Sequence, residues 1–294
     1  MTSPPIRLQR AEARGDTIRF ERPDGAARAL ADGFFALAIP DHFDPGPGIN
    51  FCRKFHLPRH GREDDAYRGF RSLPKIYFDR EDFQVEHVLT DTESRRRYFP
   101  SQLTKMVDSM TDIGLTVLRS TLADLNIPAT LWDRATSGAA HGHGTHWFVA
   151  HHYRGRRDQP GCAPHKDTGF VTILFAETPG LETFRDGTWH AVDPLPGHFI
   201  VNFGQSFEIL TRRLARSTTA SLHRVRRFAS RELAQDRISF AAFIDPPLTG
   251  KLYRIHEDET VSSEISIEDF LRLNNEKTWN DHADFGVSAP SRKN

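Results

Sequence analysis

Five polar residues in the second half of the chain have the types and spacing of a metal and carboxylate site. His165 and Asp167 are two residues apart, and His223 follows 56 residues after Asp167. Two imidazoles and one carboxylate are the ligand set of a non-haem Fe(II) oxygenase, which leaves coordination positions open for O2 and a co-substrate. Arg237 and Ser239 follow, and a guanidinium with a hydroxyl two residues on could bind the far carboxylate of an oxo-acid co-substrate.

This spacing requires an extended chain and a strand that returns. Residues two apart in a strand point to the same side, so His165 and Asp167 can reach one ion together. The segment before His223 is long enough for several strands to pass and bring the third ligand back across a barrel. Each piece alone is weak evidence, because the chain has 15 histidines. The ordered set favours a metal site.

Short apolar runs separated by turns surround these residues from about 146 to 245. Strands are expected over 147–153, 169–176, 181–184, 188–192, 198–203, 222–228 and 238–244. Several short strands at this spacing are typical of a barrel or sandwich and not of βαβ units. The last strand is apolar on both faces, with Ala241 and Phe243 on the same face as Arg237 and Ser239, so it should be central and buried.

Helical patterns lie on both sides of this part of the chain. The longest, over 101–127, has apolar residues at steps of three and four, which predicts one stripe packed against a sheet. A short helix over 24–32 should end at Gly33 and lead into a buried strand over 34–39. Ser266 can cap a short helix that follows it.

Composition and charge limit the partners of the chain. Its 294 residues include 39 basic and 39 acidic side chains, so no net field recruits nucleic acid or an anionic membrane. Two cysteines, Cys52 and Cys162, cannot form a disulfide framework and indicate a cytoplasmic location. No signal-peptide pattern and no apolar run of roughly 20 residues is present. We expect a small-molecule substrate, no nucleic acid or membrane partner, and a monomer or homodimer.

The motifs around the five polar residues resemble those of the isopenicillin N synthase-like branch of the Fe(II)/2-oxoglutarate-dependent dioxygenases. The matching stretches are 165–169 leading into 171–174, Gly187-x-Trp189, 192–197, 201–204, 223–225 and Arg237-x-Ser239. Residues 33–35 and 67–70 resemble the N-terminal region of that family. The resemblance covers roughly residues 24–247.

The resemblance implies a mainly β fold with flanking helices around a double-stranded β-helix (jelly-roll) core. It implies that His165, Asp167 and His223 hold Fe(II) and are the catalytic residues. It also implies that Arg237 and Ser239 hold the distal carboxylate of the co-substrate 2-oxoglutarate. Related halogenases carry a small residue at the carboxylate position, so the aspartate here argues against halogenation.

The resemblance also suggests an organisation and further contacts. We expect an N-terminal mixed α/β region over 1–100, a compact unit of helix, jelly-roll core and C-terminal helix over 101–287, and a flexible tail over 288–294. Tyr153 sits where the family often places a tyrosine that helps to bind 2-oxoglutarate. The candidates for substrate contact are Phe70, Arg71, Phe207 and Arg212, and the arginines near the mouth favour a carboxylate-bearing substrate.

The implied reaction uses O2 and 2-oxoglutarate, releases succinate and CO2, and hydroxylates, desaturates or cyclises an amino acid or a natural-product intermediate. The chain departs from the family pattern in two places. The 14-residue interval from His223 to Arg237 is longer than usual, which predicts an extended hairpin, and the loop at 210–213 lacks the usual Thr-Asn-Gly.

Two other functions stay open from the sequence. An isopenicillin N synthase-like oxidase needs no 2-oxoglutarate and uses its Arg-x-Ser pair on a substrate carboxylate, so that pair does not separate the two chemistries. A non-enzymatic jelly-roll binding protein would carry the same histidines as structural residues. The histidine-rich segment 141–146 is interpreted as a surface loop leading into the first core strand, and Cys162 as a packing residue.

Overall fold

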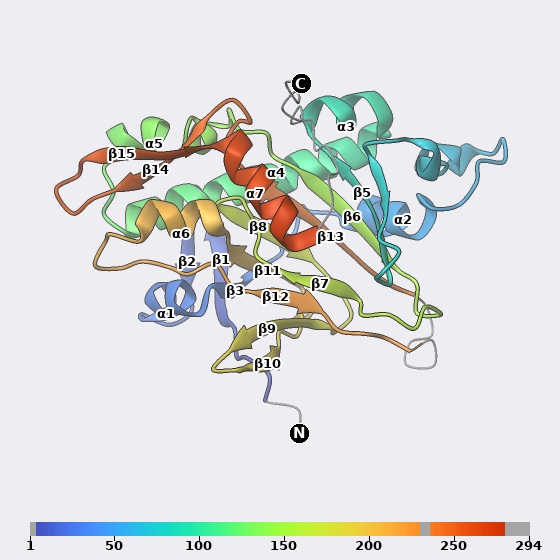
Figure 1. Ribbon diagram of the computed structural model, residues 1–294, viewed down its shortest axis with the longest axis horizontal. Coiled ribbons are helices and arrows are strands. Elements are labelled where there is room, and N and C mark those ends of the chain that lie inside the picture. The colour runs from blue at the N-terminus through green and yellow to red at the C-terminus, as the bar shows by residue number, and fades with distance from the viewer. Residues whose placement is uncertain (1–3, 230–235, 280–294) are drawn as a thin grey trace, which may run out of the picture.

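The computed structural model describes residues 4–229 and 236–279, and its strands form two main sheets and a hairpin (Figure 1). The larger sheet has the order β2 (Thr17–Phe20), β1 (Gln9–Arg14), β3 (Phe34–Ala38), β11 (His198–Phe203), β8 (Val171–Phe175), β13 (Arg237–Ile244), β6 (Phe148–Tyr153), β5 (Val85–Thr90) and β4 (Tyr77–Asp79). The smaller sheet has the order β10 (Thr188–Ala191), β9 (Leu181–Arg185), β12 (His223–Val225) and β7 (Cys162–His165). The hairpin is β14 (Lys251–Ile255) with β15 (Val261–Ser266).

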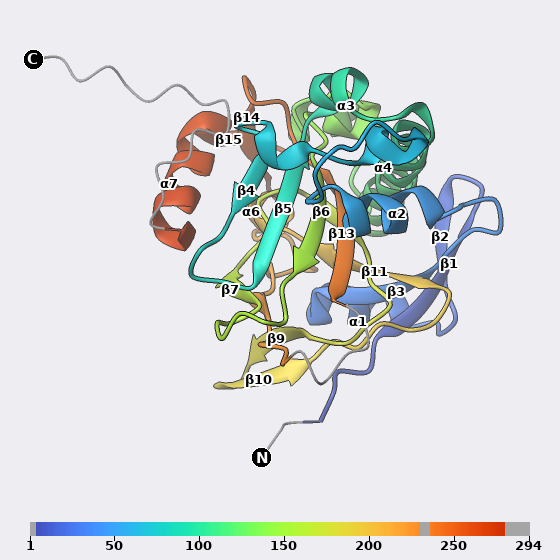
Figure 2. The ribbon, with the colours of Figure 1, turned by 90° about the vertical axis from the view of Figure 1, so that its right-hand side faces the viewer.

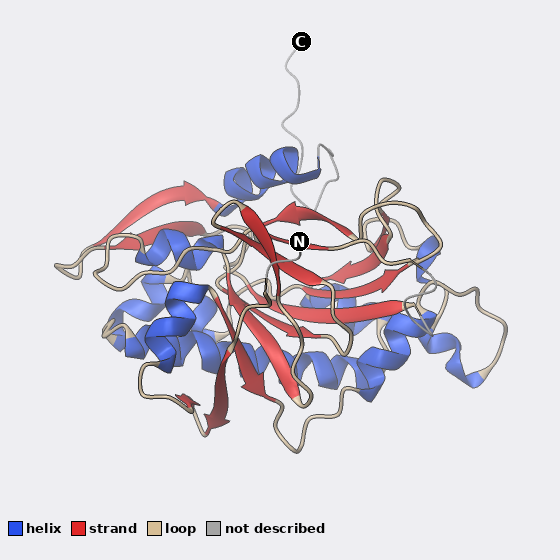
Figure 3. Cartoon of the chain, turned by 90° about the horizontal axis from the view of Figure 1, so that it is seen from below, coloured by secondary structure: helices blue, strands red, loops and turns tan. Residues whose placement is uncertain are grey.

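The two sheets form the mainly β jelly-roll core that the resemblance implies, with helices around it (Figure 3). All seven strands expected between 147 and 244 are present, although β12 is shorter than its predicted range. Strand β13 pairs with β6 on one side and β8 on the other, so its central position is confirmed. One face of this strand therefore looks into the space between the sheets.

Helices cover the outside of this core. They are α1 (Gly25–Asp32), α2 (Gly46–Lys54), α3 (Thr92–Tyr98), α4 (Ser101–Asp124), α5 (Ala129–Ala135), α6 (Gln205–Thr211) and α7 (Ile267–Trp279). Helices α2 and α4 lie on the outer face of the larger sheet, while α7 lies on the other side near β7 (Figure 2). No helix in the described ranges is both long enough and apolar enough to cross a membrane.

The long helix α4 buries its apolar stripe against the sheet, as predicted. Leu103, Met110 and Val117 are fully buried. A Cβ atom on Gly114 would lie 2.6 Å from the side chain of Ile244 on β13, so this glycine sets how closely the helix approaches the strand. The helix ends at Asp124, short of the predicted 127.

Two predicted helix ends are confirmed. Gly33 closes α1 in the left-handed conformation with φ of 72°, and β3 follows as a buried strand. At the start of α7, Ser266 accepts a hydrogen bond from the backbone N–H of Asp269 and donates one to its carboxylate. The extended hairpin and the flexible tail fall on 230–235 and 280–294, outside the described residues.

Gly114→Leu should destabilise the protein by about 2 kcal/mol, because the added side chain must push α4 away from β13. Chemical denaturation measures the free energy of unfolding of both proteins. Asp112→Leu, on the exposed face of the same helix, is the matched control and should change stability by less than about 0.5 kcal/mol. Equal effects of the two substitutions would contradict the close approach.

Candidate active site

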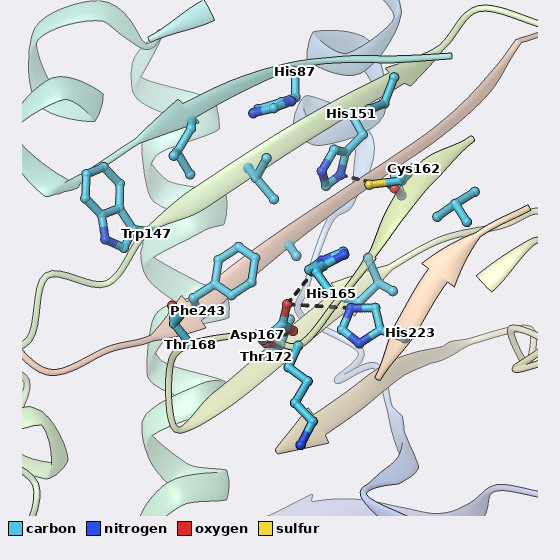
Figure 4. Close-up of a pocket in the computed structure, with 18 of the residues that line it drawn as sticks. His87, Trp147, His151, Cys162, His165, Asp167, Thr168, Thr172, His223 and Phe243 are labelled. Atoms are coloured by element: carbon cyan, nitrogen blue, oxygen red, sulfur yellow. Dashed lines mark hydrogen bonds and ion pairs between the residues drawn. The ribbon is translucent and has the colours of Figure 1, made fainter. Parts of the chain in front are cut away.

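The two histidines and the aspartate meet where β7 and β12 pair. His165 ends β7, His223 begins β12, and the two are direct partners in the sheet register. Their ring centroids are 4.4 Å apart, and each Nε2 lies 3.6 Å from Oδ1 of Asp167. The three side chains point toward one another at the edge of a cavity (Figure 4).

Backbone carbonyls fix the orientation of both rings. Nδ1 of His165 lies 2.9 Å from the carbonyl oxygen of Ala163, and Nδ1 of His223 lies 3.0 Å from that of Ser221. A carbonyl only accepts, so each Nδ1 carries the proton and the lone pair is on Nε2. Both lone pairs therefore face the aspartate. This is the arrangement in which metal-ligating histidines are usually held.

The two oxygens of Asp167 have different surroundings. Oδ2 accepts hydrogen bonds from Oγ1 of Thr172 at 2.6 Å and from Nδ2 of Asn202 at 2.8 Å, whereas Oδ1 faces the histidines. Burial opposes ionisation of the carboxyl, but the neighbouring His223 and His165 and the two hydrogen bonds outweigh it and lower the pKa. The result is one anionic oxygen directed at the position between two imidazoles.

Burial also lowers the pKa of His165 to about 4, and the nearby His223 adds to the shift. The imidazole of His165 is therefore neutral at neutral pH, which is the form that binds a metal. Nitrogen from two imidazoles and oxygen from one carboxylate are the donors that suit a non-haem Fe(II) site. The donor set fits that ion.

A buried cation occupies another part of the same cavity. Arg237 and Ser239 on β13 are each 2% exposed. Within the described residues, the guanidinium of Arg237 donates to the carbonyl of Pro179 and to the Ser239 hydroxyl, and lies 4.6 Å from the ring centroid of Tyr153. Burial lowers the pKa of this arginine. Its neutral partners leave a desolvated positive charge suited to the carboxylate of a ligand.

The cavity that joins these groups has a volume of about 240 Å³. Its lining includes the two histidines and aspartate, Arg237, Ser239 and Tyr153. The structure thus brings together every residue that the sequence assigned to metal or co-substrate. Cys162 also lines the cavity and packs in a small apolar cluster with Val85 and Val225, in agreement with its predicted packing role.

The four residues predicted to contact substrate lie elsewhere, and that prediction finds no support in their positions. Phe70 and Phe207 are at most 1% exposed and belong to the main hydrophobic core. Arg71 is bonded to Glu86, and Arg212 is bonded to Glu264 at 2.6 Å. None of the four is among the residues that line the cavity.

Residues that were not predicted from the sequence to be part of the site form much of the cavity wall. They come from β5, β6 and α7 and include His87, Leu89, Trp147, Val149, Leu271 and Asn274. Strand β5 is buried on both faces, so its sequence does not alternate and gives no strand signal. In the segment 141–146, the rings of His141 and His143 are exposed while His146 is buried.

A second group of metal-ligating side chains, His56, Glu86 and His152, lies outside the cavity lining. The carboxylate of Glu86 accepts hydrogen bonds from Arg71 at 2.8 and 2.9 Å and from the Tyr77 hydroxyl at 2.6 Å. Its oxygens are therefore already engaged by a cation of the protein itself.

Both ring nitrogens of His152 are already engaged in this second group. Its Nδ1 lies 2.9 Å from Glu86, and its Nε2 lies 3.1 Å from the carboxylate of Asp236. Burial, and then the neighbouring His152, lower the pKa of His56 to about 4, so this neighbouring ring is neutral. Glu86 and His152 are therefore occupied by other side chains of the protein, unlike the ligand atoms that face the cavity.

A jelly roll with two imidazoles and one carboxylate beside a buried arginine has the side chains to hold a metal ion and an anionic ligand. Residues 144–246 match the model of the 2OG-Fe(II) oxygenase superfamily. Protein DMR6-LIKE OXYGENASE 2 of Arabidopsis thaliana is 30% identical over 169 residues, which are 56% of this chain and 45% of that protein. The 2'-deoxymugineic-acid 2'-dioxygenase of Hordeum vulgare is 28% identical over 202 residues, 66% of this chain and 56% of that protein.

Solved structures share the fold over nearly the whole chain. The dioxygenase for auxin oxidation in rice has a TM-score of 0.63 and 20% identity, and the match covers 96% of this chain and all of the other. JOX2, in complex with 2OG, Fe and JA, has a TM-score of 0.62 and 19% identity, over 84% and 79% of the two chains. The chain spans about half the length of the two curated relatives above. The similarity to the 2OG-Fe(II) oxygenase superfamily rests on residues 144–246, which are 103 of the 294 residues.

Glu86→Gln should destabilise the protein by about 3 kcal/mol at pH 6, because Arg71 and His152 lose a buried anionic partner. The pKa of Glu86 is about 2, against an ordinary 4.5, so its contribution is present above pH 4.5 and is lost as the pH falls toward 2. The difference from the parent should shrink by roughly half between pH 6 and pH 3.

Denaturant unfolding of Glu86→Gln and the parent at pH 6 and pH 3 measures this difference in stability. Glu264→Gln removes a half-exposed carboxylate from Arg212 and Arg254 and is the control, with an expected cost below about 1 kcal/mol. A difference that grows on acidification would show that Glu86 is not ionised in the folded protein.

Proposed function

We propose that this protein is an Fe(II)/2-oxoglutarate-dependent dioxygenase that oxidises a small molecule. The observation that carries the proposal is the convergence of two Nε2 lone pairs and one carboxylate oxygen in a cavity that also holds a buried arginine. His165, Asp167 and His223 would hold the iron. Hydroxylation, desaturation and cyclisation are the outcomes compatible with this ligand set, and a natural-product intermediate is the proposed kind of substrate.

Arg237 and Ser239 would bind the distal carboxylate of 2-oxoglutarate. The guanidinium can replace its contact to a neutral carbonyl with a charge-assisted pair, which is stronger in a desolvated site. The ring of Tyr153 lies against the guanidinium and limits its movement. Bound iron would supply activation of O2, coupled to conversion of 2-oxoglutarate to succinate and CO2.

Other residues of the site would orient the aspartate and exclude water. Thr172 and Asn202 restrain one oxygen of Asp167, so the aspartate would offer a single oxygen and leave room for further ligands. The walls of the cavity are mostly apolar and would keep water from the reacting groups. These are contributions of the chain itself, whichever substrate is oxidised.

His223→Ala and Asp167→Asn should each lower Fe(II) affinity by about a hundredfold or more, which exceeds the usual effect of losing an outer-sphere partner. Anaerobic equilibrium dialysis with Fe(II) alone measures this, and the parent should bind one ion per chain. His56→Ala in the second group is the control and should bind Fe(II) like the parent. Loss of binding in His56→Ala, with binding kept in His223→Ala, would overturn the ligand assignment.

Arg237→Met should raise the Kd for 2-oxoglutarate about a hundredfold, because a charge-assisted pair in a buried site is lost, while Fe(II) binding stays unchanged. Titration of the anaerobic Fe(II) protein with 2-oxoglutarate measures the affinity. Succinate release should accompany O2 consumption in the parent. O2 consumption with substrate but without any 2-oxoglutarate would instead support an isopenicillin N synthase-like oxidase.

A further inference from the structure

The wall of the cavity opposite the iron-site residues is built from three strands in register. Strands β5, β6 and β13 present it in successive rows, because β6 pairs with both neighbours. From one end to the other the rows are Val85–Tyr153–Arg237, His87–His151–Ser239, Leu89–Val149–Ala241 and Trp147–Phe243. All eleven side chains line the cavity, and Figure 4 shows His87, His151 and Trp147 on this wall. Arg237 therefore lies at one end of the wall, and Trp147 and Phe243 lie at the other.

Charge is distributed unevenly over the lining. The cations of the described lining are Arg80, Lys166 and Arg237. The backbone of Arg80 bonds to Val85, in the same row as Arg237, and Lys166 is paired with Glu208 at 3.1 Å. The two rows that begin at Leu89 and Trp147 contain apolar side chains and no charged one.

Two buried polar side chains, His87 and Asp245, lie next to these apolar rows. His87 is 7% exposed, and its Nδ1 has no hydrogen-bond partner within the described residues. Burial, then His151 and Arg80, lower its pKa well below the usual range, so the ring is neutral. Asp245, just after β13, is also 7% exposed, and burial raises its pKa to about 7. The ring of His87 lines the cavity, and a neutral imidazole can form a hydrogen bond with a ligand there through a ring nitrogen.

We propose that the substrate is a neutral, largely apolar small molecule, placed against Trp147 and Phe243, with one hydroxyl, carbonyl or amide group hydrogen-bonded to His87. This rests on the proposed function and assigns 2-oxoglutarate to the arginine end. An anionic group placed at these two rows would lose its hydration beside apolar side chains and would face the carboxyl of Asp245. The reason for expecting a carboxylate-bearing substrate disappears, because Arg71 and Arg212 are paired outside the cavity.

Equilibrium dialysis with pairs of probes tests this, using the anaerobic Fe(II) protein saturated with 2-oxoglutarate. The pairs share a ring and differ in charge: 2-phenylethanol with phenylacetate, and indole-3-ethanol with indole-3-acetate. Each alcohol should bind at least about tenfold more tightly than its carboxylate. His87→Leu should weaken the alcohols about tenfold, whereas His87→Gln, which keeps a hydrogen-bonding group, should stay within about threefold of the parent.

Asp245→Asn keeps the shape of the side chain and removes its charge, so at pH 8 it should narrow the gap between alcohols and carboxylates. Thermal unfolding of each variant confirms that it is folded. Carboxylates that bind as well as the alcohols, alcohols unaffected by His87→Leu, or no binding of any probe would overturn the inference. Failure of 2-oxoglutarate to bind before any probe is added would instead overturn the proposed function.

Discussion

The carboxylate of Asp167 links the two sheets of the jelly roll, and the site depends on that link. Its Oδ2 is held by Thr172 on β8 and Asn202 on β11, which are direct partners in the larger sheet. Its Oδ1 faces His165 and His223, which belong to the smaller sheet. The side chain of Asp167 thus sets the distance between the larger sheet and the two imidazoles. A buried anion is tolerated there because donors and imidazoles surround it on both sides.

The two histidine and carboxylate groups contain the same residue types, and their surroundings give them opposite properties. In the cavity, backbone carbonyls accept hydrogen bonds from the Nδ1–H groups of both histidines. The Nε2 lone pairs are thereby directed at one carboxylate oxygen. In the second group, Arg71 and Tyr77 occupy Glu86, and two carboxylates occupy the ring nitrogens of His152. The positive charge that balances the carboxylates is therefore already present there. Residue type alone does not decide which group takes an ion.

Local pattern predicted seven strands between 147 and 244 and the facing of several polar residues, whereas the jelly-roll arrangement came from the family resemblance. His165 and Asp167 share a strand spacing, and Arg237 and Ser239 begin a strand that is apolar on both faces, so their directions follow from period alone. The opposite wall was not predictable in this way, because β5 is buried on both faces and shows no alternation. Phe70 was proposed as a substrate contact because it belongs to the N-terminal region, yet it packs against Phe51 and Phe99 in the core. Such packing depends on segments far apart in sequence.

The position of Arg237 also limits how substrate and co-substrate can share one cavity. A carboxylate gains most by reaching the buried guanidinium, whose partners within the described residues are neutral. An anionic substrate would therefore compete with 2-oxoglutarate for the same end. A neutral substrate gains nothing there and is favoured by the apolar rows beginning at Leu89. On the proposed function, the separation of Arg237 from the apolar rows would let two small molecules occupy one cavity without exchanging places.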